Sequence, residues 1–169
     1  MSYRNKTYVI FDGDNDMWAY ARMKGWKSLK NIDFNFYDAH DIMPLTKQAK
    51  SEDYIKSKLT TRMSSAKQVI VLVGQSTKNL YKFVRWEIDR AIKDDLPIVV
   101  VNLNGIRSID WDLCPPILKG KNAIHVPFKL RIIKHSLDNF PPFYKSLYST
   151  KPANWYYQYN VYEKLGLND

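Results

Sequence analysis

Apolar and polar positions alternate along this chain with two different periods, which mark successive strands and helices. The predicted strands are short apolar or alternating runs at 6–11, 33–38, 68–74, 96–103 and 123–128. The segments between them have helical spacing, and predicted helices cover about 14–25, 51–66 with Ser51 as N-cap, the second half of 71–92, and a segment from about Arg131. The continuous apolar runs are typical of central parallel strands that are covered on both faces.

Strands that alternate with crossover helices predict a doubly wound α/β domain with a parallel five-stranded sheet in flavodoxin-like order and flanking helices. We expect this domain to occupy 1–128. The remainder, 129–169, is basic and aromatic and is predicted to be a C-terminal helical extension packed on the same domain.

Composition favours a globular cytoplasmic protein. The chain is 45% hydrophobic and 14% aromatic, and no apolar run approaches the roughly 20 residues of a membrane span. The short apolar stretch near the N-terminus ends at Asp12, which indicates a first strand rather than a signal peptide. The one cysteine, Cys114, cannot form an internal disulfide.

The formal net charge of +9 changes the picture by suggesting an anionic partner. Basic residues are concentrated in 119–151, but apolar residues are interspersed among them at helical spacing, which is typical of a packed helix with a solvated face. Because no nucleic-acid-binding motif is recognisable, an anionic small ligand is favoured over nucleic acid.

Sheets of this kind bind ligands at the carboxyl ends of their strands, near the switch point in strand order. This rule selects the loops "DGDND" (12–16), "DAHDIMP" (38–44) and "GQSTKN" (74–79). The predicted site is acidic, aromatic and rich in hydroxyl groups, with Asp12, Asp14, Asn15, Asp38, Ser76 and Glu87, and with Phe11, Trp18 and Trp86 nearby.

Glu87 is the unexpected residue, because helical numbering places its carboxylate on the apolar face of its helix. One interpretation is functional: Glu87 lies on the helix face toward the sheet, and its carboxylate points to the first loop. The other is structural, with the carboxylate reaching solvent or pairing with Arg62 or Arg90. Structural interpretations also exist for the other candidates. Trp86 could pack against a neighbouring helix, and the aspartates of the first loop could cap the following helix and interact with its dipole.

Several motifs resemble the first loop without matching it. A calcium loop is excluded, because its glycine and glutamate positions hold Met17 and Met23. The D-x-D of "VIFDGDND" also resembles the first motif of haloacid-dehalogenase-like phosphatases, which remains an alternative. Their magnesium-binding acidic pair belongs after a strand, whereas Asp94 and Asp95 precede one. We therefore expect no metal site and no cofactor.

The segment from 7 to 127 resembles a TIR domain, in particular the bacterial TIR-like proteins of the Thoeris antiphage defence system. The stretches "YVIFDGDNDMWAY", "FYDAHD", "VIVLVGQSTKNLYKFVRWEIDRAI" and "PIVVVNLNG" carry the resemblance in this order. Enzymatic TIR domains have a glutamate in the helix after the third-strand loop, and Glu87 takes that place.

The resemblance implies that NAD is a substrate, cleaved between nicotinamide and ribose to give a cyclic ADP-ribose isomer after phage infection. This diffusible signal would activate an effector NADase, and the trigger would come from the phage. On this basis Glu87 is the expected catalytic residue. Ring stacking is assigned to Phe11, Trp18 or Trp86, ribose binding to Asp12, Asn15, Asp38 and Ser76, and phosphate binding to Lys78.

A different class of function stays open. A TIR module that only binds other TIR domains would also use basic helices and exposed aromatic residues, so self-association is a possible property of either class. Release of nicotinamide from NAD distinguishes an enzyme from such an interaction module.

Overall fold

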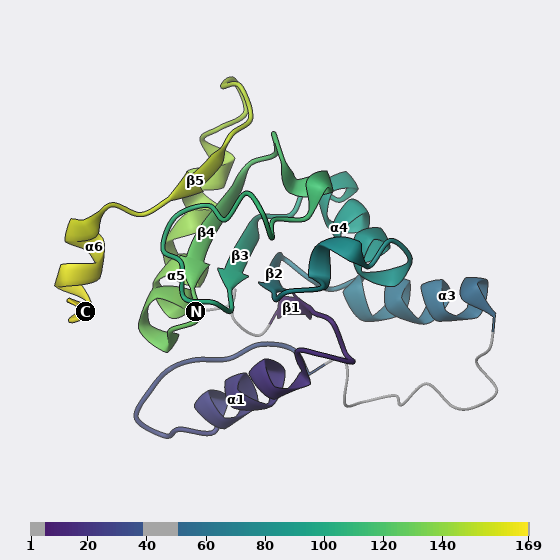
Figure 1. Cartoon of the computed structure of the whole chain (residues 1–169), viewed down its shortest axis with the longest axis horizontal. Coiled ribbons are helices and arrows are strands. Elements are labelled where there is room, and N and C mark those ends of the chain that lie inside the picture. The colour runs from purple at the N-terminus through teal and green to yellow at the C-terminus, as the bar shows by residue number, and fades with distance from the viewer. Residues whose placement is uncertain (1–5, 39–50, 169) are drawn as a thin grey trace.

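The computed structural model describes residues 6–38 and 51–168 and shows a parallel sheet with helices on both faces (Figure 1). The strands pair in the order β1-β2-β3-β4-β5, and every pair is parallel. They are β1 (Thr7–Ile10), β2 (Gln68–Val73), β3 (Ile98–Asn102), β4 (Ala123–Pro127) and β5 (Asn154–Tyr156). The predicted five-stranded α/β class is confirmed.

The helices are α1 (Met17–Lys27), α3 (Glu52–Met63), α4 (Phe83–Lys93), α5 (Leu130–Lys145) and α6 (Tyr159–Lys164), with short 3₁₀ turns η2 (Thr77–Asn79) and η3 (Pro116–Leu118). The predicted N-cap of α3 is confirmed, because the Ser51 side chain accepts a hydrogen bond from the Tyr54 amide. In the described ranges, no helix is long and apolar enough to cross a membrane.

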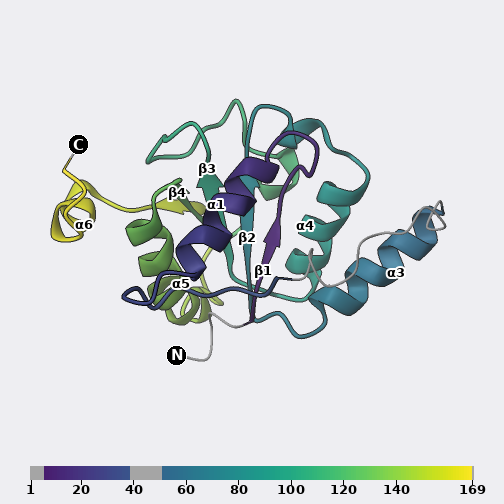
Figure 2. The same ribbon diagram turned by 90° about the horizontal axis from the view of Figure 1, so that it is seen from below.

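Each strand sends alternate side chains to opposite faces of the sheet, and two separate cores result. On one face, residues such as Val9 and Leu72 pack against α1 and α5. On the other face, residues such as Tyr8 and Val71 pack against α3 and α4. Figure 2 shows α1 crossing one face of the sheet while α3 and α4 lie to the side of β1. This division places Tyr8 and the buried face of α4 in the same core.

The prediction of a strand at 33–38 is wrong. The Tyr37 amide donates to the Thr7 carbonyl of β1, but no residue of 33–38 is in a strand. On the side away from β1, side chains satisfy the backbone: Asn35 Oδ1 accepts from the Phe36 amide, and Lys27 Nζ donates to the Phe36 carbonyl. The segment therefore lies beside β1 as an extended connection that contributes aromatic side chains to the core.

The fifth strand instead comes from the C-terminal part of the chain. Residues of β5 pair in parallel with β4, from Ala123 opposite Asn154 to His125 opposite Tyr156. Helix α5 packs the apolar residues Ile132 and Leu137 against the sheet. The segment predicted as a helical extension thus also supplies an edge strand, and it shares the core of the preceding residues.

Candidate functional site

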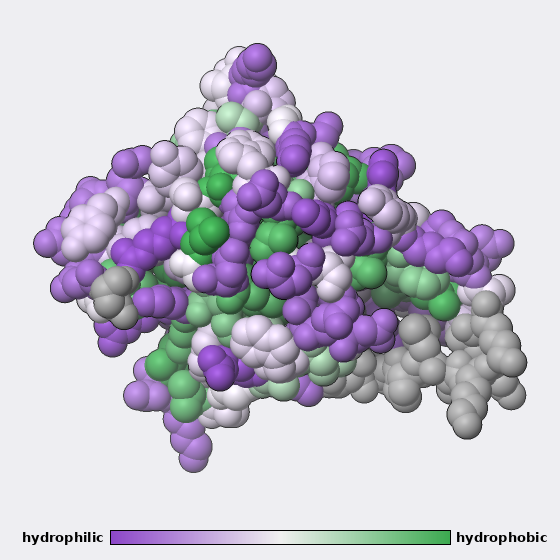
Figure 3. Space-filling view, viewed as in Figure 1, coloured by the Kyte–Doolittle hydropathy of each residue, from purple (hydrophilic) through white to green (hydrophobic). Residues whose placement is uncertain are grey.

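A pocket of about 720 Å³ lies between the loop that follows β1 and the helices α3 and α4. Ligand sites of small molecules and cofactors typically have volumes of about 300–1,000 Å³. Its lining comes from the first loop (Phe11, Asp12, Gly13, Asp14), from α3 (Ile55, Leu59, Arg62), from the approach to α4 (Asn79, Leu80, Tyr81, Lys82) and from α4 itself (Phe83, Val84, Glu87). Figure 3 shows hydrophobic residues along α3 and where α3 approaches α4, among a largely hydrophilic surface.

Glu87 is buried in the wall of this pocket, with 4% of its surface exposed. Its neighbours on the same face of α4, Val84 and Ile88, pack against the sheet. The Tyr8 hydroxyl donates a 2.6 Å hydrogen bond to Glu87 Oε2. Glu87 therefore faces inward because it meets a polar group from β1 and a cavity, rather than a continuous apolar surface.

Burial raises the pKa of Glu87 to about 7, and the Tyr8 hydrogen bond and the positive charge of Arg62 oppose this rise. Arg62 reaches the pocket from α3 and is itself 8% exposed. Burial and the nearby Glu87 raise the pKa of Tyr8, so its hydroxyl keeps its proton and remains a donor. The arrangement holds one carboxyl group near its point of ionisation at neutral pH, a property that clusters at functional sites.

The carboxylate of Asp12 is used within its own loop. Its Oδ1 accepts from the amides of Asp14 and Asn15, and its Oδ2 accepts a 2.7 Å bond from the Asn15 side chain. Burial would raise the pKa of Asp12, but these bonds and a further one from Ser76 hold it below its ordinary value. Asp12 and Asn15 thus fix the shape of the loop, which leaves Asp14 exposed at the pocket.

Asp16 is a second buried carboxyl group at this edge of the sheet, and sequence reasoning missed it. Burial and the charge of Asp12 raise its pKa, against a weak hydrogen bond from Thr77. The Thr77 hydroxyl in turn accepts from the Gly74 amide. A side chain at Gly74 would meet the Asp16 carboxylate, since an added Cβ would lie 2.4 Å from its Oδ2. Glycine at this position lets the first loop close on the end of β2.

Of the residues predicted for the site, Glu87, Phe11, Asp12 and Asp14 line the pocket, while Asn15 and Ser76 contact it through Asp12. The structure places the others elsewhere. Trp18 packs edge-on against Phe128 and is 49% exposed. Lys78 donates to the Asp112 carbonyl, and Trp86 lies between the outer faces of α3 and α4.

The expectation that Asp38 ends a strand at the ligand-binding edge is wrong. Asp38 forms a 2.8 Å ion pair with Lys27, at the end of α1. The adjacent Tyr37 bonds Thr7 at the start of β1, and neither Asp38 nor Lys27 lines the pocket. The rest of the predicted loop, 39–44, falls outside the described residues.

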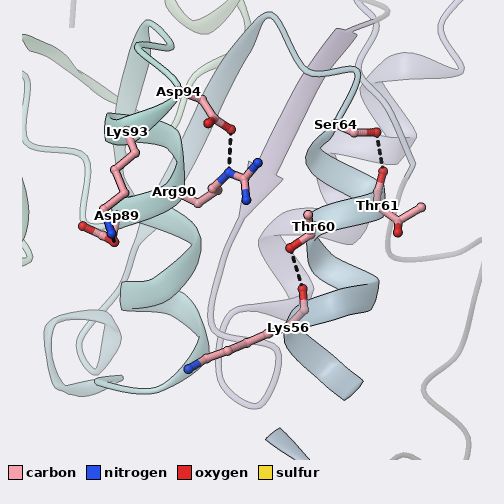
Figure 4. A network of polar contacts seen from close by, with 8 residues as sticks. All are labelled: Lys56, Thr60, Thr61, Ser64, Asp89, Arg90, Lys93 and Asp94. Atoms are coloured by element: carbon pink, nitrogen blue, oxygen red, sulfur yellow. Dashed lines mark hydrogen bonds and ion pairs between the residues drawn. The ribbon is translucent and has the colours of Figure 1, made fainter. Parts of the chain in front are cut away.

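Tyr8, Arg62 and Leu59 were not identified as candidate site residues. The signal for Tyr8 was a polar hydroxyl group in an otherwise apolar strand, on the face shared with α4. Arg62 was considered only as a surface partner of Glu87; the other proposed partner, Arg90, bonds Asp94 instead, as Figure 4 shows.

The phosphatase alternative finds no support in this geometry. Asp94 and Asp95 follow α4 and precede β3, which is the edge of the sheet opposite the pocket. Within 6–38 and 51–168, no three His, Cys, Asp or Glu side chains gather in a group suited to a metal ion.

Comparison with known proteins identifies one family. The family model described as "Thoeris protein ThsB, TIR-like domain" matches residues 8–108. The match includes Tyr8 of β1, the pocket residues of α3 and Glu87 in α4, so the whole of the described pocket lies within it. No curated protein matches the chain.

Proposed function

This chain belongs to the family of Thoeris ThsB TIR-like domains, and we propose that this TIR-type defence module acts as an NAD-consuming enzyme. In this proposal it cleaves the bond between nicotinamide and ribose and forms a cyclic ADP-ribose isomer. The single observation that carries the proposal is the buried Glu87 carboxyl group in the wall of a pocket of nucleotide size.

The chemistry needs a negative charge close to the ribose. When the glycosidic bond breaks, nicotinamide leaves as a neutral molecule with the bonding electrons, and positive charge develops on the sugar as an oxocarbenium-like centre. A fixed carboxylate stabilises such a centre, as it does in glycosidases. In its ionised form Glu87 would do this, and because nicotinamide leaves without a proton, no strong acid is required.

Tyr8 and Arg62 would prepare Glu87 for this role. The Tyr8 hydroxyl fixes one carboxylate oxygen by a 2.6 Å bond, and the charge of Arg62 favours the ionised form. The second oxygen of Glu87 would then remain for the ribose. The apolar side chains of Leu59 and Val84 border the same space and would limit the access of water.

The fate of the ribosyl cation decides the product. Attack by water gives linear ADP-ribose, whereas attack by a nucleophilic group of the same molecule closes a ring. In a Thoeris system the cyclic isomer would act as the diffusible signal that activates a partner effector, and infection by a phage would trigger its synthesis. Self-association of this chain is compatible with that scheme.

Nicotinamide release tests the proposal directly. The purified chain would be incubated with NAD, with and without extract from phage-infected cells, and nicotinamide would be followed by chromatography. We expect release that Glu87→Gln abolishes and that Glu163→Gln, at an exposed site in α6, leaves unchanged. If neither the resting nor the triggered protein releases nicotinamide, the module is a non-catalytic interaction domain.

A further inference from the structure

A second hollow, of about 290 Å³, adjoins the pocket and lies between the outer faces of α3 and α4. Tyr81 and Lys82 line both spaces, so they form the wall where the two meet. The remaining lining comes from Glu52 and Lys56 of α3, from Arg85, Trp86 and Asp89 of α4, and from Ile117. Figure 4 shows the Lys56 side chain extending from α3 toward α4.

The two spaces differ in charge. The inner pocket has three carboxyl groups, Asp12, Asp14 and Glu87, against two cations, Arg62 and Lys82. The second hollow has three cations, Lys56, Lys82 and Arg85, against two carboxylates, Glu52 and Asp89.

Each of the two carboxylates of the second hollow is paired with lysine. Glu52 pairs with Lys56 at 2.7 Å and with Lys82 at 3.7 Å, and Asp89 pairs with Lys93 at 2.6 Å. The balance of this hollow is therefore positive, with Arg85 as a cation on the exposed face of α4.

Resting on the proposed function, we propose that the second hollow binds the adenosine diphosphate half of the dinucleotide. Lys82 and Arg85 would contact the pyrophosphate, and the partly buried Trp86 would stack on the adenine. NAD carries its positive charge on the nicotinamide and its negative charge on the pyrophosphate. The acidic pocket and the basic hollow divide charge in the same way, and they meet at Lys82.

The start of α4 adds to this arrangement. The helix begins at Phe83, directly after the shared wall of Tyr81 and Lys82. The positive end of its dipole favours an anion beside Lys82. The position predicted for phosphate binding from the sequence, Lys78, is instead held by the Asp112 carbonyl at 2.6 Å. Lys82, four residues further along the chain, takes over that role in this proposal.

Binding of the two separate halves of the substrate tests the inference without any turnover. The probes are ADP for the second hollow and nicotinamide riboside for the inner pocket, titrated into the full purified chain by calorimetry. We expect Arg85→Ala to weaken ADP binding by about tenfold or more, as for a lost charged hydrogen bond, and to leave nicotinamide riboside unaffected. Trp86→Ala should also weaken ADP alone.

Arg90→Ala is the matched control, because it removes the same charge from the same helix at a position outside both spaces. ADP binding that is absent from the wild type, or equal in Arg85→Ala and Arg90→Ala, would overturn the inference. The proposed function fails on a different result, namely nicotinamide release that persists in Glu87→Gln. ADP binding is expected to survive that substitution, so the two failures are distinguishable.

Discussion

The Tyr8 hydroxyl and the Glu87 carboxylate form a 2.6 Å hydrogen bond between β1 and α4. Both groups are buried, and 79 positions separate them in the chain. The bond favours the ionised form of Glu87 against the effect of burial, which raises its pKa to about 7. The degree of ionisation of the candidate catalytic group therefore depends on a tyrosine from another element.

Tyr8→Phe removes this bond and little else. Because a hydrogen bond to the charged form is lost, the pKa of Glu87 should rise above its present value of about 7. The acid limb of the pH–rate profile should move to higher pH, so activity falls at pH 7 and recovers in alkaline buffer. Tyr162→Phe, at another buried tyrosine remote from the pocket, is the control and should not move the limb. An unmoved limb in Tyr8→Phe would refute the coupling.

Glu87 should also make stability depend on pH. Burial raises its pKa to about 7 in the folded chain from an ordinary value of 4.5, so between these values the folded state binds more protons than the unfolded state. Stability contributed at this site is therefore lost as pH rises from about 4.5 to 7, by on the order of 3 kcal/mol for a shift of this size.

Glu87→Gln removes this loss of folding stability at high pH, because glutamine does not ionise. The variant should melt at the same temperature as the wild type or lower near pH 5, and several degrees higher near pH 8. Thermal melts of the two proteins across this range isolate the effect, because every other titrating group is shared. A difference in melting temperature that is independent of pH would contradict the assigned ionisation.

The two aspartates first assigned to ribose binding should behave differently. Asp12→Ala leaves the amides of Asp14 and Asn15 without their acceptor. We therefore expect the free energy of unfolding to fall by about 1–3 kcal/mol and activity to be reduced. Asp38→Ala breaks only a partly exposed pair with Lys27, and activity should remain at the wild-type level. Denaturation curves and nicotinamide assays on both variants check this. Equal loss of activity in the two would mean that the pocket is misplaced.

Truncation after Pro127 should give an insoluble or unfolded protein. It removes α5 and β5, which uncovers the strands that Ile132, Leu137 and Phe140 now cover, and leaves β4 as an unpaired edge. Expression of the truncated chain followed by size-exclusion chromatography tests this. A monodisperse truncated protein that retains activity would show that the C-terminal part is accessory.

The sequence predicted the layers of this fold better than its connections. Apolar runs such as 68–74 and 96–103 locate central strands because burial on both faces excludes polar residues. The segment 33–38 also alternates, but Asn35 and Lys27 satisfy backbone groups there, and no pattern in the segment reports their positions. The strand β5 has three residues, too few for a recognisable period.

The same distinction holds for the site. Glu87 was identifiable because a carboxylate on an apolar helix face breaks the expected pattern. Tyr8 and Arg62 follow the pattern of their own elements, and only the packing of β1, α3 and α4 brings them to Glu87. Trp18 and Lys78 are near the site in sequence, yet one packs on Phe128 and the other bonds Asp112.

The most direct measurement for the central claim is nicotinamide release from NAD by Glu87→Gln in parallel with Glu163→Gln, under triggered conditions. Loss of one preorganised electrostatic group typically costs roughly a hundredfold or more in rate. Glu87→Gln should therefore remain folded and release nicotinamide at least about a hundred times more slowly, while Glu163→Gln keeps the wild-type rate. A folded Glu87→Gln protein that releases nicotinamide at the wild-type rate would contradict the account.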